Sequence, residues 1–179
     1  MMKRRQAVER ISLILGGALS PQLTAALMGQ VINKGSSIEV TDAQVALLAE
    51  VADVIIPTTD TPGAKAAGAG QFIIRVMRDC YEFRDQETFY NGLAKIDEAS
   101  HKAHGKGFVN LSPELKIEII TDATKTNKAF FSHMKRLTVT GYFTSEIGAT
   151  QALEYLPVPG KFEGDVPLQP GQKAWAISR

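Results

Sequence analysis

The sequence is poor in the residues that most often carry chemistry. Its 179 residues include one cysteine, three histidines and one tryptophan. The single cysteine, Cys80, excludes an internal disulfide and a C-x-x-C-H haem attachment. This fits a reducing compartment, and it fits equally a protein that is exported already folded. Because Cys80 lies in an apolar run, we predict that it is a small buried hydrophobe.

An excess of charge of either sign is also missing. The 20 basic and 19 acidic residues give a formal net charge of +1. No basic patch dominates, so we do not expect nucleic acid as a partner. Hydrophobic residues make up 44% and charged residues 22%, which excludes a disordered chain and is typical of a globular one. A chain of this length forms one domain with a core that needs no disulfides.

The motifs of nucleotide binding and nucleophilic catalysis are absent. Gly68-Ala69-Gly70 is the nearest approach to a dinucleotide loop, but position 73 is isoleucine and no strand is predicted before it. Ser132 and His133 are neighbours in a predicted helix, where adjacent residues do not face each other. No G-x-S-x-G elbow occurs. The sequence therefore predicts no catalytic residues.

One set of residues suggests a metal site. Glu98, His101 and His104 are spaced three apart, which places them on one face of a predicted helix. A Glu-x-x-His step is used by di-iron carboxylate bundles, but such bundles need two of these steps. The second step is missing, because Phe130 stands three residues before His133. An independent periplasmic metal-binding helical enzyme stays open as an alternative, although we predict no metal site.

Residues 1–30 have the pattern of an export leader. Lys3, Arg4 and Arg5 are followed by an apolar stretch without charge from residue 11 to 19. The adjacent Arg4 and Arg5 indicate the twin-arginine route. Cleavage stays open, because no clear A-x-A site precedes Met28. The alternative is an amphipathic N-terminal helix of a cytosolic protein, and residues 31–40 are predicted as a linker.

Residues 41–155 are predicted to form an all-α domain of about five helices. Thr41 with Gln44 three residues later reads as a capping box, and Pro57 ends the helix that begins there. We expect Asp53 to accept backbone hydrogen bonds and Asp60 to lie in a tight loop, with a role at an interface open for both. Further helix starts are expected at Thr61-Pro62, near residue 85, at Ser112-Pro113-Glu114 and at Asn127.

Residues 156–179 are predicted to be an extended, irregular tail. Prolines at positions 157, 159, 167 and 170 exclude regular structure and stiffen the backbone. Aromatic residues near and within this tail suit protein association, because such residues are enriched at interface hot spots. The alternative for each is burial in its own core. The predicted partner-binding residues are Tyr142, Phe143, Tyr155, Pro157, Pro159, Phe162 and Trp175.

Two blocks of sequence carry a family resemblance. The first is GYFTSEIGATQALEYLPVPGKFEG at residues 141–164, with Phe130-Phe131 before it and Lys173-Ala174-Trp175-Ala176 after it. The second is ADVIIP at residues 52–57, followed by TDTPGA at residues 59–64. Together they resemble the small third subunit of the gluconate 2-dehydrogenase family.

The resemblance implies a small subunit that is not catalytic by itself. Such a subunit binds, stabilises and co-exports a flavin-dependent dehydrogenase of the glucose–methanol–choline class, which oxidises a sugar or sugar acid. It implies no cofactor in this chain, FAD in the partner and a cytochrome c as electron acceptor in some complexes. The twin-arginine machinery would carry the folded pair to the periplasm, with membrane association through the leader or the complex left open. A free-standing helical binding module is a further alternative, and the sequence does not name the sugar.

Overall fold

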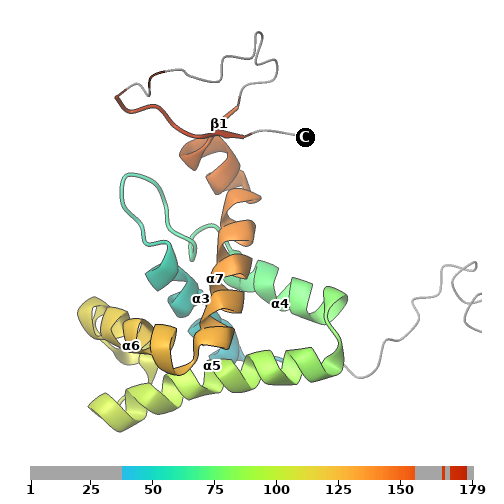
Figure 1. The fold of residues 1–179 in the computed structure, drawn as a ribbon, viewed down its shortest axis with the longest axis vertical. Coiled ribbons are helices and arrows are strands. Elements are labelled where there is room, and N and C mark those ends of the chain that lie inside the picture. The colour runs from blue at the N-terminus through green and yellow to red at the C-terminus, as the bar shows by residue number, and fades with distance from the viewer. Residues whose placement is uncertain (1–37, 156–166, 168–169, 177–179) are drawn as a thin grey trace, which may run out of the picture. The chain divides into compact units, whose positions relative to one another are not determined.

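The computed structural model describes residues 38–155, 167 and 170–176. The predicted leader, with Arg4 and Arg5, lies outside these residues, as do Pro157, Pro159 and Phe162. The described helices are α3 (Asp42–Ile55), α4 (Ala69–Cys80), α5 (Phe83–His104), the short 3-10 turn η1 (Phe108–Asn110), α6 (Pro113–Thr126), α7 (Lys128–Phe143) and the π-helical turn η2 (Gly148–Ala152). Two short strands follow, β1 (Glu154–Tyr155) and β2 (Trp175–Ala176). The prediction of an all-α domain is confirmed (Figure 1).

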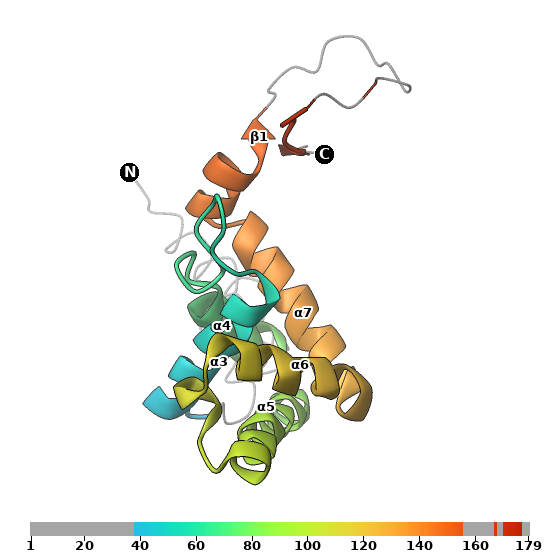
Figure 2. The same ribbon diagram turned by 90° about the vertical axis from the view of Figure 1, so that its left-hand side faces the viewer.

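Helix α3 begins where the capping box predicted. The Thr41 hydroxyl accepts a hydrogen bond from the backbone N–H of Gln44 at 3.3 Å, and the Gln44 side chain accepts one from the Thr41 N–H at 2.9 Å. The helix ends at Ile55, two residues before Pro57. It packs against α4, α5, α6 and α7 and lies centrally among them in both views (Figures 1 and 2). Its buried residues are Leu47, Leu48, Val51 and Ala52.

Two glycines let α7 approach its neighbours closely. A Cβ atom on Gly92 of α5 would lie 2.6 Å from Cδ2 of Phe130, and one on Gly141 would lie 2.7 Å from Cδ1 of Phe72. In the α5–α7 pair and the α4–α7 pair, an aromatic ring therefore packs directly against the backbone of a glycine. Asn127, at the start of α7, donates from its side chain to the Gly92 carbonyl at 3.0 Å and fixes this approach.

The region around α4 departs from the prediction in two ways. Thr61-Pro62 does not start a helix, because residues 57–68 form a loop and α4 begins at Ala69, after Gly68 in a left-handed conformation (φ 72°). Cys80 is exposed, so the prediction of burial is wrong. It is the last residue of α4, almost one turn beyond Met77, the last buried residue of that helix.

The two short strands form a parallel pair at the end of α7. Glu154 lies opposite Trp175, and the Glu154 N–H donates to the Ala174 carbonyl at 2.9 Å. We predicted an irregular tail, but these positions carry no proline, so their backbone donors can pair. In the part of the chain that the structure describes, none of the helices combines the length and apolarity needed to cross a membrane.

Candidate partner-binding surface

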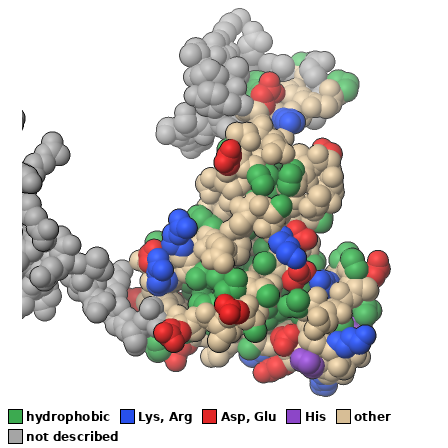
Figure 3. All heavy atoms as spheres, turned by 180° about the vertical axis from the view of Figure 1, so that it is seen from behind, with side chains coloured by type: hydrophobic (Ala, Val, Ile, Leu, Met, Phe, Trp, Pro, Cys, Tyr) green, Lys and Arg blue, Asp and Glu red, His purple; other side chains and the backbone are tan. Residues whose placement is uncertain are grey.

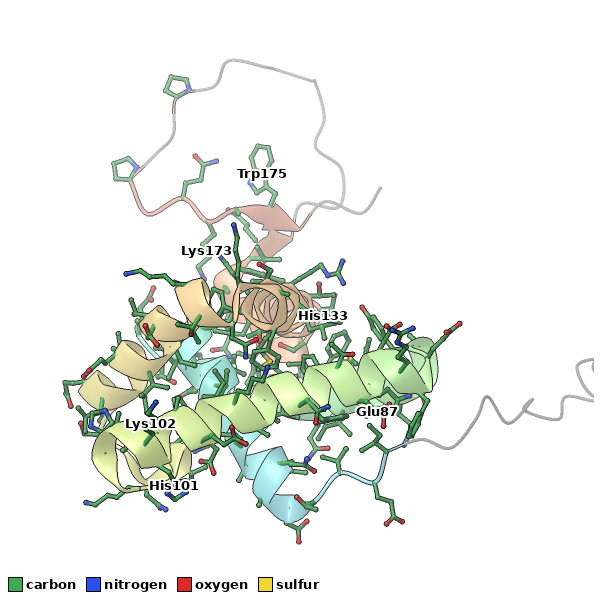
Figure 4. All side chains as sticks on the ribbon, turned by 60° about the horizontal axis from the view of Figure 1, so that its bottom comes forward. Glu87, His101, Lys102, His133, Lys173 and Trp175 are labelled. Atoms are coloured by element: carbon green, nitrogen blue, oxygen red, sulfur yellow. The ribbon has the colours of Figure 1, made fainter. Side chains whose placement is uncertain are left out.

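The candidate metal ligands of the alternative reading do not form a site with further ligands. Glu98 and His101 are exposed on α5, where His101 lies 3.6 Å from the Asp97 carboxylate. His104 has a buried Nε2 without a hydrogen-bond partner. His133 lies on α7, well away from His101 at the end of α5 (Figure 4). No group of three or more His, Cys, Asp or Glu among the described residues is arranged to hold a metal.

Three large apolar side chains are exposed toward the end of the domain where α7 runs into η2 and β1. They are Val139, Phe143 and Trp175, with exposed fractions of 36%, 39% and 43%. Val139 and Phe143 are four residues apart and share one face of α7. Trp175 projects away from the helices (Figure 4). We call these three residues the end face, and two of them, Phe143 and Trp175, were predicted as partner contacts.

Tyr142 has a different position from the one predicted. Its ring is buried, at 2% exposure, so the alternative of burial in its own core holds for this residue. Its hydroxyl donates to the Pro62 carbonyl at 3.0 Å and lies 3.3 Å from Oγ1 of Thr61. The ring also meets that of Phe143 edge to face at 5.1 Å. The buried Tyr142 ring therefore packs against the exposed Phe143 and is not itself available to a partner.

The β1–β2 pair fixes the base of the tail. Lys173 donates from Nζ to the Gln151 carbonyl at 2.6 Å, beside the strand pairing described above. These contacts tie Trp175 to Glu154, just after η2, although 20 residues lie between the two positions. The side chain of Tyr155 lies outside the described residues.

Asp53 lies near the end of α3, and Asp60 lies in the loop between α3 and α4. Asp53 accepts a hydrogen bond from the Lys65 N–H at 3.4 Å, which confirms its predicted structural role. Asp60 is exposed and accepts from the Thr59 hydroxyl at 2.8 Å. This bond, with backbone N–H donors and the positive charge of Lys173, holds the pKa of Asp60 below its usual value. The carboxylate therefore stays ionised near neutral pH.

A second polar cluster, which the sequence reasoning missed, lies between α5 and α7. The Tyr81 hydroxyl is 3.0 Å from Nε2 of His133 and accepts from Arg136 at 3.1 Å. Burial and the Arg136 charge lower the pKa of His133, and Asp85 opposes this shift. Tyr81, Asp85 and His133 border a cleft of about 520 Å³, whose lining also includes Phe89 and Phe130. No local pattern could have revealed it, because Tyr81 and His133 are 52 residues apart.

Charge is distributed without a dominant sign on the face shown in Figure 3. Acidic and basic side chains are interspersed there around a group of exposed apolar ones. This agrees with the near-zero net charge of the sequence. A surface of this kind favours recognition through apolar contacts with a polar rim.

Comparison with known proteins gives one finding. A family model described as gluconate 2-dehydrogenase subunit 3 matches residues 42–160. The match begins at the first residue of α3 and includes every described helix and β1, so it covers the loop at residues 57–68 and Phe143. Neither the curated proteins nor the solved structures provide a match.

Proposed function

The chain belongs to the gluconate 2-dehydrogenase subunit 3 family, and on that premise we propose that it is the non-catalytic small subunit of a gluconate dehydrogenase complex. In this role it binds and stabilises a flavin-dependent catalytic subunit that oxidises a sugar or sugar acid. The FAD belongs to that partner. This chain supplies surface and an export signal.

The observation that carries the proposal is the end face. Phe143 and Trp175 are large aromatic side chains, each about two-fifths exposed; Phe143 lies on α7 and packs against Tyr142, and Trp175 lies in the β1–β2 pair. Exposed aromatic residues are the usual anchors of protein interfaces, since burying them costs little conformational entropy.

Export of the folded pair is the second part of the proposal. Arg4 and Arg5 precede a mildly apolar stretch, as in leaders of the twin-arginine route. In this reading the machinery of that route moves the small subunit together with its partner to the periplasm, where the complex passes electrons to a cytochrome c. Replacement of Arg4 and Arg5 by lysine should leave both chains in the cytoplasm, while Lys3→Arg should not.

The partner interaction is tested with the full-length chain, tagged and produced in its native host. The wild type should recover a flavin-containing polypeptide that reduces a dye when gluconate or a related sugar acid is added. Phe143→Ala and Trp175→Ala should each weaken this association about tenfold. The matched control is Ile117→Ala, which removes another exposed apolar side chain (56% exposed) from α6. If no flavoprotein accompanies the wild type, or if it does not oxidise such substrates, the proposal is wrong.

A further inference from the structure

An exposed loop lies beside the end face, and several hydrogen bonds fix its conformation. Residues 57–60 are exposed and Thr61 and Pro62 are half-buried; we call residues 57–62 the docking loop. Its bends are closed by hydrogen bonds from the Thr59 N–H to the Thr61 carbonyl at 3.0 Å and from the Gly63 N–H to the Thr58 hydroxyl at 2.9 Å. The loop is therefore a fixed shape on the surface.

The strongest support for the loop comes from α7, eighty residues away in sequence. The Tyr142 hydroxyl donates to Pro62 and lies against Thr61, as described above. A phenylalanine would fill the same buried space, so the hydroxyl serves the loop and not the core. Figures 1 and 2 both show the α3–α4 loop beside the end of α7.

The last turn of α7 thus couples two surface elements. Tyr142 points inward and holds the docking loop, while its neighbour Phe143 points outward on the end face. The positive charge of Lys173, at the base of the tail, acts on Asp60 of the loop. Because Tyr142 bonds to Pro62, the docking loop lies beside the turn of α7 that carries Phe143, and a partner that covers Phe143 can also reach the loop.

The chemistry of the loop indicates what it would recognise. Asp60 presents an exposed carboxylate that the Thr59 hydroxyl orients at 2.8 Å. An oriented anion at the rim of an apolar contact selects a cationic group and raises the rate of association. The threonines around it add hydroxyl donors and acceptors but no apolar area.

We propose that the docking loop is a second contact for the catalytic subunit, that Asp60 receives an arginine or lysine of that subunit, and that Tyr142 is the positioning residue of the loop. This inference rests on the proposed function, since it concerns the same partner. It adds a polar, charge-selective element to the apolar end face.

The charge is tested with Asp60→Asn in the full-length chain, measured against the flavin-dependent dehydrogenase that the wild type recovers. The amide oxygen can still accept a hydrogen bond from the Thr59 hydroxyl, so the variant chiefly removes the charge. Affinity should fall about tenfold at low salt, and the difference should shrink at high salt because salt screens exposed charges. The control is Asp122→Asn, an exposed carboxylate on α6. An Asp60→Asn variant that binds like the wild type at low salt overturns the inference.

The positioning role is tested with Tyr142→Phe, and with Tyr90→Phe as a control that removes the hydroxyl of another buried tyrosine, on α5. Tyr142→Phe should speed amide exchange at residues 59–63 and weaken partner binding about fivefold, while the melting temperatures of the two variants stay similar. Faster loop exchange with unchanged affinity overturns the role of the loop. A wild type that binds no flavin-dependent dehydrogenase overturns the proposed function and this inference together, whereas wild-type binding with unaffected loop variants overturns the inference alone.

Discussion

At the scale of single residues, Glu50 connects more of the fold than any other charged side chain described above. From α3 it accepts a hydrogen bond from Lys116 of α6 at 2.7 Å and another from Lys65, which follows the docking loop. The side chains of Glu50 and Lys116 are only 15% and 13% exposed, so this pair is largely removed from solvent. Burial acts to raise the pKa of Glu50, but the bonds from Lys116 and Lys65 outweigh it and hold the pKa below the usual value of a glutamate.

This shift predicts how stability depends on pH. A carboxylate whose pKa is lower in the folded state stabilises the fold above its unfolded pKa, and it loses that contribution as the pH falls through the folded value. Glu50→Gln should therefore cost about 1–3 kcal/mol of unfolding free energy at pH 7, because Lys116 loses its charged partner. The cost should shrink below about pH 4. Urea unfolding from pH 7 to pH 3 checks this, with the exposed Glu118→Gln as control; a cost that is constant over that range would contradict it.

The partners of Glu50 could not be predicted from the sequence. The two lysines that bind Glu50 lie 15 and 66 residues away, and no periodic pattern relates them. Tyr142 illustrates a related limit. Its aromatic ring was a reasonable contact residue by type, but only the packing of α7 against the α3–α4 loop shows that it points inward.

At the scale of elements, the close packing of α5 against α7 depends on Gly92. A methyl group there would lie 2.6 Å from the Phe130 ring and 2.8 Å from its Cβ, so rotation of the ring alone cannot relieve the clash. Alanine gains about 1 kcal/mol in helix propensity, but overpacking costs about 1–3 kcal/mol. We expect Gly92→Ala to be destabilised by roughly 1 kcal/mol, because Phe130 is itself wedged against Phe89 at 5.3 Å. Thermal unfolding compared with the exposed Asn91→Ala decides this, and a more stable Gly92→Ala would disprove it.

The helices were largely predictable because their signals are local. The capping box of Thr41, the proline after Ser112 and the apolar period of α5 each act within one or two turns. The helix start predicted near residue 85 is observed at Phe83. The prediction failed at Thr61-Pro62, where the local start signal is real but long-range bonds to Tyr142 hold the segment as a loop. The exposure of Cys80 was missed for a similar reason, since periodicity does not show where a helix extends beyond the helices that it packs against.

At the scale of the whole molecule, the described chain divides into a helical core and a lightly held end. The core buries residues from all five α-helices, whereas β2 is attached through a two-residue parallel pair and the Lys173 hydrogen bond. A pair of strands this short is marginal in water. Part of the partner surface therefore sits on an element that opens more easily than the core that carries it.

Trp175 allows this difference to be measured, because it is the only tryptophan in the sequence. In the free full-length chain, we expect tryptophan fluorescence to change at a lower urea concentration than helical circular dichroism, since β2 detaches before the helices unfold. Lys173→Ala removes the bond to Gln151 and should therefore increase the difference between the urea midpoints of the two transitions. Replacement of Lys135, an exposed lysine of α7, by alanine should leave this difference unchanged.

In the complex, the catalytic subunit covers the end face, so β2 can open only when the partner is lost. The resonance of 5-fluorotryptophan placed only in this chain should then persist until the complex dissociates. Coincident fluorescence and dichroism transitions in the free chain would show that the tail base is as stable as the core.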